Sequence, residues 1–277
     1  MDKKPDDIPK KEVIFKDFKV PKVLPVRDAD PDPRIKPVHP NIPQPPALIL
    51  GIGAVKSGKT TLINSMLFQS RADGFYGAQD YFDETIIISN TINNDPTARF
   101  LKKAFSVVDY YTDGMITELI SKQDGYGQKV DMPLLCLICD DILGTNMKRN
   151  NEISFLATRF RHKNIGLMGV FVQNFKSADT ILRNNATDVF IFKQTNNKQL
   201  QHVAEEYSSM FGSINKFYEI YKRATKKKFD FLYLKVQEGK ALRSFEEVIW
   251  DVDTDLDPNE EDDINDNPIE EEKLENI

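Results

Sequence analysis

Residues 53–60 of this 277-residue chain are Gly53-Ala54-Val55-Lys56-Ser57-Gly58-Lys59-Thr60, which match the phosphate-binding loop pattern G-x-x-x-x-G-K-[ST] at every fixed position. The apolar run at 47–52 predicts a buried strand leading into this loop, and residues 60–67 predict a helix leading out of it. In such a loop the backbone N–H groups and the helix N-terminus attract phosphate oxygens. A chance match in a strand-to-helix turn is the alternative. The strand, helix, lysine and threonine together favour binding of a nucleoside triphosphate.

The last two residues of the loop are expected to contact the phosphates and the metal ion. Lys59 is expected to reach the outer phosphates, and the Thr60 hydroxyl is expected to hold Mg²⁺. The residues predicted to contact the nucleotide are Gly53, Ala54, Val55, Lys56, Ser57, Gly58, Lys59, Thr60 and Thr61.

Strand and helix patterns alternate along the middle of the chain. Strands are predicted over 48–52, 85–89, 134–139, 167–172, 189–192 and 229–236, and helices over 60–69, 97–105, 115–122, 152–160, 198–210 and 215–224. Continuous apolar strands separated by helices predict an α/β fold, a three-layer sandwich whose mostly parallel sheet is covered on both faces. In such sheets the site lies beyond the carboxyl ends of the strands.

The two ends of the chain differ from its middle in composition. Residues 1–46 hold most of the 15 prolines and predict an extended N-terminal arm, whereas residues 251–277 are strongly acidic and predict a disordered tail. A P-loop domain is expected between them, over 47–250. The overall net charge is −6, although the chain without the acidic tail is mildly basic. This basic body is compatible with a nucleic-acid partner.

The sequence predicts neither a membrane-spanning segment nor a redox-active cysteine pair. No apolar stretch approaches the roughly 20 residues that cross a bilayer, so no membrane span is expected. The N-terminus lacks the apolar segment of a signal peptide, which favours a reducing compartment. Cys136 and Cys139 alternate along an apolar strand, so we expect two buried core residues rather than a redox or zinc pair.

Two aspartates follow the predicted strand at 134–139. Asp140 would complete the Mg²⁺ shell together with Thr60, and Asp141 would polarise the attacking water. Paired aspartates that simply end a strand in a turn are the alternative. Because a phosphate-binding loop is present in the same chain, we favour the catalytic interpretation.

Polar side chains near the next strand are candidates for sensing the γ-phosphate. Gln173 ends the strand at 167–172, with Asn174 as a rival for the same role. Arg159, Arg161 and Arg183 are candidates for an arginine finger, which neutralises charge on the transferred phosphoryl group. For each arginine the alternative is a solvated or ion-paired side chain.

Taken in order, these segments resemble the FtsK/HerA superfamily, and within it they are most similar to the genome-packaging ATPases of large DNA viruses and virophages. The resemblance covers about residues 47–236 and depends on the loop at 53–60, Asp140-Asp141, Arg159-x-Arg161-His162, Gln173 and Arg183-Asn184-Asn185. Superfamily members more often carry Asp-Glu where this chain has two aspartates. The resemblance implies the additional-strand, RecA/FtsK-like order. In this order the strand that ends at Gln173 lies between the strand before the phosphate-binding loop and the strand before Asp140.

The resemblance also implies a function. ATP and Mg²⁺ would be the cofactors, and ATP hydrolysis in a homo-oligomeric ring would move double-stranded DNA into a capsid through a vertex or portal component. The location would be the host cytoplasm, a viral factory or the virion. The candidate DNA contacts are Lys148 and Arg149 in a pore loop, and the cluster Lys226, Lys227 and Lys228. For this cluster a solvated helix end is the alternative.

Two other functions remain open at the level of sequence. A nucleotide or nucleoside kinase would explain the phosphate-binding loop equally well, but it does not predict Gln173 or the basic body. A nucleotide-gated virion assembly factor that does not hydrolyse ATP is the third hypothesis. This hypothesis is based on Asp141, whose side chain is shorter than the glutamate that more often polarises the attacking water in the superfamily.

Overall fold

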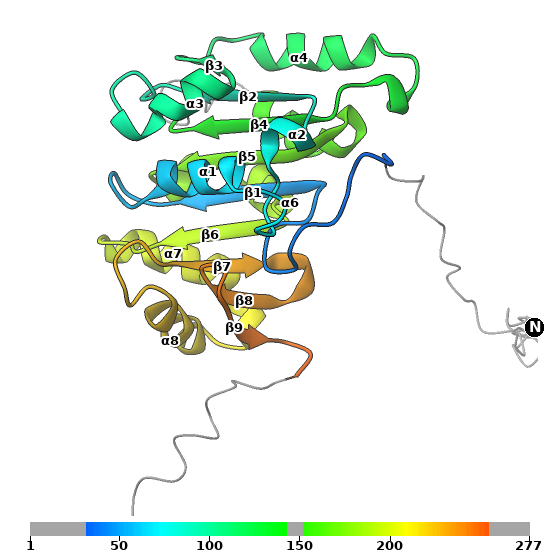
Figure 1. Cartoon of the computed structure of the whole chain (residues 1–277). Coiled ribbons are helices and arrows are strands. Elements are labelled where there is room, and N and C mark those ends of the chain that lie inside the picture. The colour runs from blue at the N-terminus through cyan, green and yellow to red at the C-terminus, as the bar shows by residue number, and fades with distance from the viewer. Residues whose placement is uncertain (1–31, 143–151, 255–277) are drawn as a thin grey trace, which may run out of the picture. The chain divides into compact units, whose positions relative to one another are not determined.

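A computed structural model of the chain describes residues 32–142 and 152–254 (Figure 1). In this described part, nine strands form one sheet in the order β3-β2-β4-β5-β1-β6-β7-β8-β9. Neighbouring strands from β3 to β6 in this order are parallel, and β7, β8 and β9 add antiparallel pairs at one edge. The strands are β1 (Ala47–Ile52), β2 (Glu84–Ser89), β3 (Ser106–Val108), β4 (Leu135–Asp140), β5 (Ile165–Val172), β6 (Asp188–Phe192), β7 (Phe231–Lys235), β8 (Lys240–Arg243) and β9 (Glu247–Asp251).

Helices cover both faces of the sheet. One face packs against α1 (Lys59–Phe68), α2 (Ala78–Tyr81) and α3 (Arg99–Ala104). The other packs against α4 (Met115–Asp124), α5 (Glu152–Ala157), α6 (Thr180–Asn185), α7 (Asn197–Tyr207) and α8 (Ile214–Ala224). The predicted three-layer α/β sandwich is therefore confirmed. Every helix of the described ranges is too short or too polar to cross a lipid bilayer.

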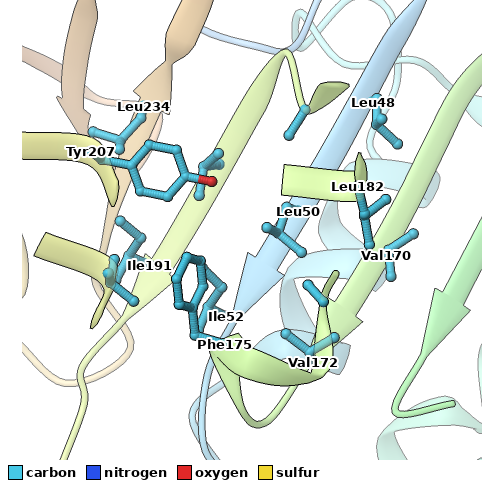
Figure 2. Packing of buried hydrophobic residues seen from close by; sticks show 14 of the residues in the cluster. Leu48, Leu50, Ile52, Val170, Val172, Phe175, Leu182, Ile191, Tyr207 and Leu234 are labelled. Atoms are coloured by element: carbon cyan, nitrogen blue, oxygen red, sulfur yellow. The ribbon is translucent and has the colours of Figure 1, made fainter. Parts of the chain in front are cut away.

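The central strands are buried on both sides because the helices lie on both faces. Alternate residues of β1 point into two separate cores. Leu50 and Ile52 pack with Phe175, Leu182 and Tyr207 on the α6–α7 side (Figure 2). The alternate residues of β1, Ala47 and Ile49, belong to the core on the α1 side of the sheet. This two-sided burial explains why β1 is a continuous apolar run in the sequence.

The expected strand order is confirmed at the centre of the sheet, where β5 lies between β1 and β4. In register, Phe171 pairs with Gly51 on one side and with Asp140 on the other. The ends of β1, β4 and β5 therefore meet at one border of the sheet, which we call the carboxyl edge. The opposite border, where these strands begin, is the amino edge.

Several element boundaries differ from the sequence prediction. The strand predicted over 229–236 is the shorter β7, because Phe229 has φ 74° and cannot extend the strand. The helices predicted over 152–160 and 198–210 end at Ala157 and Tyr207, and 3₁₀ turns follow. The prediction missed β3, β8, β9, α2 and α6. These elements are short and mix polar with apolar residues, so they carry little periodicity.

Residues 32–46 pack against the domain. Ile42 is buried, the Tyr76 hydroxyl donates to the carbonyl of Pro43 at 2.7 Å, and Lys235 Nζ donates to the carbonyl of Pro40 at 2.9 Å. Side-chain donors thus fix the proline-rich backbone, which has few donors of its own.

The two cysteines are core residues, as predicted. Cys136 and Cys139 are both free and buried, and they lie in the two different cores.

Candidate nucleotide-binding site

A cleft of about 650 Å³ opens at the carboxyl edge of the sheet. One wall is the phosphate-binding loop with the start of α1, and the other walls come from the loop after β2 and the loop before β7. Its lining residues are Val55, Lys56, Ser57, Gly58, Lys59, Thr60, Thr61, Thr91, Asn94, Asp95, Pro96, Thr97, Asp141, Gln173, Lys228 and Phe229. Seven of the nine residues predicted to contact the nucleotide therefore lie in this cleft.

The backbone of the loop depends on its glycines. Gly58 precedes α1 with φ 108°, a conformation that favours glycine. A Cβ atom at Gly53 would lie 2.4 Å from Ser57 Oγ and 3.0 Å from Phe192 Cβ, so a larger residue here would force these neighbours to move. Lys56 has φ 63° and Val55 is exposed, so the tip of the loop turns toward solvent.

The Lys59 side chain lies inside the phosphate-binding loop. Its side chain is only 5% exposed, and Nζ donates to the carbonyl oxygens of Gly53 at 2.9 Å and Ala54 at 3.4 Å. The same Nζ lies 3.6 Å from Asp141 Oδ1. Gly53 and Ala54 do not line the cleft themselves, but their carbonyl oxygens hold the Lys59 ammonium group at the site. The ammonium group is desolvated at the position where a phosphate oxygen would replace these partners.

The two aspartates after β4 have different surroundings. Asp140 is 4% exposed, and its Oδ1 has no hydrogen-bond partner among the described residues. Burial, with the charge of Asp141 as a second cause, raises its pKa to about 7, although Lys59 opposes the shift. Asp141 has φ 51° and its Oδ2 accepts a hydrogen bond from Gln173 Nε2 at 3.0 Å.

Gln173, rather than Asn174, reaches the cleft. The Asn174 side chain accepts the backbone N–H of Lys176 at 3.0 Å and so caps a 3₁₀ turn. The structure therefore brings together Lys59, Asp141 and Gln173 from three different segments.

Asp95 was not predicted from the sequence. Its Oδ1 accepts hydrogen bonds from the Thr97 backbone N–H at 2.8 Å and the Thr97 hydroxyl at 2.7 Å. Burial raises the pKa of Asp95, but hydrogen bonds from Thr97 and from the Thr60 side chain outweigh burial, so the net shift is downward. Asp95-Pro96-Thr97 is a helix-start signal in the sequence. Nothing in that signal shows that the carboxylate faces Thr60.

A Mg²⁺ ion fits the oxygen groups at this edge. Thr60 and the buried, unpartnered Asp140 are hard oxygen ligands of the kind that Mg²⁺ prefers. Across residues 32–142 and 152–254, no group of three or more His, Cys, Asp or Glu side chains could hold a metal alone. The protein groups therefore suit an ion that takes its remaining ligands from phosphate oxygens and water.

The loop before β7 also contributes to the cleft. Phe229 has φ 74° and is 57% exposed, which is an unusual backbone conformation for an exposed aromatic residue. Its ring approaches Gly58, and Lys228 Nζ lies 4.8 Å from the ring centroid. Lys226 and Lys227 are exposed on the same loop but do not line the cleft. Of the three lysines proposed as DNA contacts, Lys228 thus faces the nucleotide side.

The candidate arginines lie away from the cleft lining of their own chain. Each guanidinium stacks on a phenylalanine: Arg159 on Phe155 at 4.1 Å, Arg161 on Phe160 at 5.5 Å and Arg183 on Phe175 at 4.8 Å. Arg183 Nε also lies 3.7 Å from Glu206 Oε2. Their arginine-finger role stays a prediction. Lys148 and Arg149 lie outside the described residues.

Comparison with known proteins adds a structural likeness. No protein-family model and no curated protein matches the sequence. The chain is similar to the genome packaging NTPase B204 from Sulfolobus turreted icosahedral virus 2, in its AMP and ATPγS complexes, with a TM-score of 0.50, 17% identity and coverage of 71% of this chain and 95% of that one. It is also similar to B204, the DNA-packaging ATPase from Sulfolobus turreted icosahedral virus, with a TM-score of 0.50, 16% identity and coverage of 72% and 96%. The likeness confirms the P-loop NTPase fold that the sequence resemblance predicted.

Proposed function

We propose that this protein is an ATPase that packages a viral genome by moving double-stranded DNA. The observation that carries the proposal is the convergence of Lys59, Asp141 and Gln173 on one cleft, beside a phosphate-binding loop at the carboxyl edge. The likeness of the fold to packaging NTPases supports the choice of this function among those of P-loop proteins.

The cleft has a suitable group for each part of ATP. The phosphates would lie against the N–H groups of the loop, and Lys59 would exchange the carbonyl oxygens of Gly53 and Ala54 for phosphate oxygens. The base would lie on the exposed ring of Phe229. Mg²⁺, when bound at Thr60 and Asp140, would neutralise charge on the phosphates.

The Asp141–Gln173 pair would orient the attacking water. Asp141 Oδ1 has no hydrogen-bond donor among the described residues, whereas Oδ2 is fixed by the Gln173 amide. A water between this carboxylate and the γ-phosphate would be oriented by Asp141, which would accept its proton. Gln173 compensates for the short aspartate side chain by fixing its direction.

DNA translocation and ring assembly form the finer part of the proposal. None of Arg159, Arg161 and Arg183 lines the cleft of its own chain, which is compatible with an arginine supplied by a neighbouring subunit. The exposed Lys226 and Lys227 would contact DNA phosphates without reading sequence. A capsid vertex or portal component would anchor the ring, in the host cytoplasm, a viral factory or the virion.

The test is DNA-stimulated ATP hydrolysis by the full chain. We expect duplex DNA to raise the hydrolysis rate, and we expect Lys59→Ala and Asp140→Ala to abolish it. Lys129→Ala, which removes an exposed lysine, is the matched control and should behave as the wild type. Equal hydrolysis with and without DNA across salt concentrations would contradict the motor. Phosphoryl transfer to a nucleoside would support a kinase instead, and ATP binding without turnover would support an assembly factor.

A further inference from the structure

A small cavity adjoins the nucleotide cleft and shares Thr60, Thr91 and Asp95 with it. Its volume is about 10 Å³, close to the space that a single water-sized body needs. Asp140 also lines this cavity, so carboxylates from the loop after β2 and from the end of β4 both border it. Oxygen-bearing side chains from three segments thus form one part of the cavity wall, and the apolar residues Ile63, Ile87, Ile92, Ala98 and Leu101 form the rest.

The buried Oδ1 of Asp140 is the observation that points to a ligand. It has no hydrogen-bond partner in the described part of the chain, although a buried carboxylate oxygen without a partner is costly. The neighbouring hydroxyls Ser89 Oγ and Thr91 Oγ1 lie 3.4 Å from each other, and neither bonds to Asp140 Oδ1.

Asp95 borders the same cavity from the loop after β2. Both of its hydrogen bonds from Thr97 end on Oδ1. The Thr60 side chain interacts with the same carboxylate. Thr60 is thus a neighbour of Asp95 as well as a lining residue of the cavity that contains Asp140.

From this geometry we propose that Asp95 is a second carboxylate of the metal site, which acts with Asp140 and Thr60 to hold the Mg²⁺ of the bound nucleotide. The proposal rests on the nucleotide-binding function proposed above. Mg²⁺ sites of this kind use one or two carboxylates together with substrate phosphates, so two carboxylates and a hydroxyl are a sufficient protein share. The charge of Asp95 would act on the metal directly or through a bound water.

The competing explanation is that Asp95 only caps the 3₁₀ turn Pro96–Ala98. Asparagine is as good an N-cap residue as aspartate. Asp95→Asn therefore keeps the cap and removes the negative charge. Thr97→Val removes one hydrogen bond to Asp95 Oδ1, that of the hydroxyl, and leaves both the carboxylate and the capping backbone N–H in place.

The experiment measures Mn²⁺ binding to the full chain saturated with ADP, by electron paramagnetic resonance of free Mn²⁺, together with ADP binding in EDTA by calorimetry. We expect Asp95→Asn to weaken Mn²⁺ binding by about tenfold or more, with ADP affinity in EDTA unchanged or higher. Thr97→Val and the exposed-carboxylate control Asp80→Asn should bind Mn²⁺ like the wild type. Asp95→Ser, which also caps helices, replaces Asp95→Asn if the asparagine variant does not fold.

The outcomes separate this inference from the proposed function. If Asp95→Asn binds Mn²⁺ as tightly as the wild type, Asp95 is only a cap and the inference is wrong. If Thr97→Val weakens Mn²⁺ binding as much as Asp95→Asn, the effect belongs to the hydrogen bonds around Asp95 rather than to its charge, and the inference is also wrong. If the wild type binds no ADP, the proposed function fails, and the inference fails with it.

Discussion

Two buried aspartates at opposite edges of the sheet have opposite environments. At the amino edge, Asp32 is 3% exposed and accepts hydrogen bonds from Arg34 Nη2 at 2.6 Å and Asn164 Nδ2 at 2.8 Å. The hydrogen bond from Arg34 is the largest cause that lowers the pKa of Asp32 to about 2. At the carboxyl edge, Asp140 is equally buried, but burial raises its pKa to about 7 and its Oδ1 has no partner among the described residues.

The two edges differ in how they satisfy these carboxylates, although the amide oxygen Asn164 Oδ1 at the amino edge also has no hydrogen-bond partner among the described residues. The amino edge satisfies its buried charge with its own side chains, so removing one partner there should destabilise the fold. The carboxyl edge leaves Asp140 Oδ1, Asp141 Oδ1 and Ser57 Oγ without hydrogen-bond partners among the described residues. Unsatisfied buried polar atoms of this kind cost folding free energy and are expected where a ligand completes the structure. Substitutions at the two edges should therefore have opposite effects on stability and activity.

The largest effect is expected from Lys59→Ala. ATP hydrolysis should fall by about a hundredfold or more, because the variant would lose the cation that we propose contacts the phosphates in the transition state. The free energy of unfolding should fall by only about 1 kcal/mol, since the lost bonds go to two carbonyl groups. Steady-state hydrolysis and urea denaturation measure the two quantities. A variant as active as the wild type would remove Lys59 from the mechanism.

Arg34→Ala should show the reverse pattern at the amino edge. It removes the cation from the buried Asp32 carboxylate, so the free energy of unfolding should fall by about 2 kcal/mol, less than for a fully buried pair because Arg34 is partly exposed. ATP hydrolysis at a temperature where the variant is folded should stay unchanged, because Arg34 lies at the other edge of the sheet. An equal loss of activity would show that the two edges are coupled.

Asp140→Asn should increase stability while it abolishes activity. Since the folded pKa of about 7 exceeds the ordinary value of 3.8, the folded chain keeps a proton that the unfolded chain releases between these pH values. The free energy of unfolding of the wild type therefore falls as pH rises through this window. In EDTA, Asp140→Asn should be more stable than the wild type by about 2 kcal/mol at pH 8 and equally stable near pH 4. A variant less stable at pH 8 would contradict the comparison.

The smallest effect is expected at the rim of the cleft, from Phe229→Gly. Glycine accepts φ 74° without strain, so stability should stay level or rise by up to about 1 kcal/mol. The base would lose its stacking surface, and ATP affinity should fall by about fivefold. Lys227→Ala changes an exposed residue of the same loop that does not line the cleft, and it serves as the matched control in an ATPγS titration. Unchanged affinity in Phe229→Gly would show that the base binds elsewhere.

The sequence was sufficient for the parts of the site that one local segment encodes. The loop at 53–60 and the ends of β4 and β5 each combine an apolar run with a fixed polar residue, so Lys59, Asp140 and Gln173 could be named as candidates and their common position at the carboxyl edge could be predicted. Asp95 and Phe229 could not, because each belongs to a loop whose approach to the cleft is set by the packing of other elements. The same limit applied to β8 and β9, whose pairing depends on β7 rather than on periodicity.

We infer that the carboxyl edge becomes complete only when a nucleotide binds, and calorimetric titration with ATPγS and Mg²⁺ measures this binding. We predict saturable binding with one nucleotide per chain for the wild type and for Arg34→Ala. Lys59→Ala should lose most of this binding while it stays folded. The account would be contradicted if the wild type bound no ATPγS, or if Lys59→Ala bound it as tightly as the wild type.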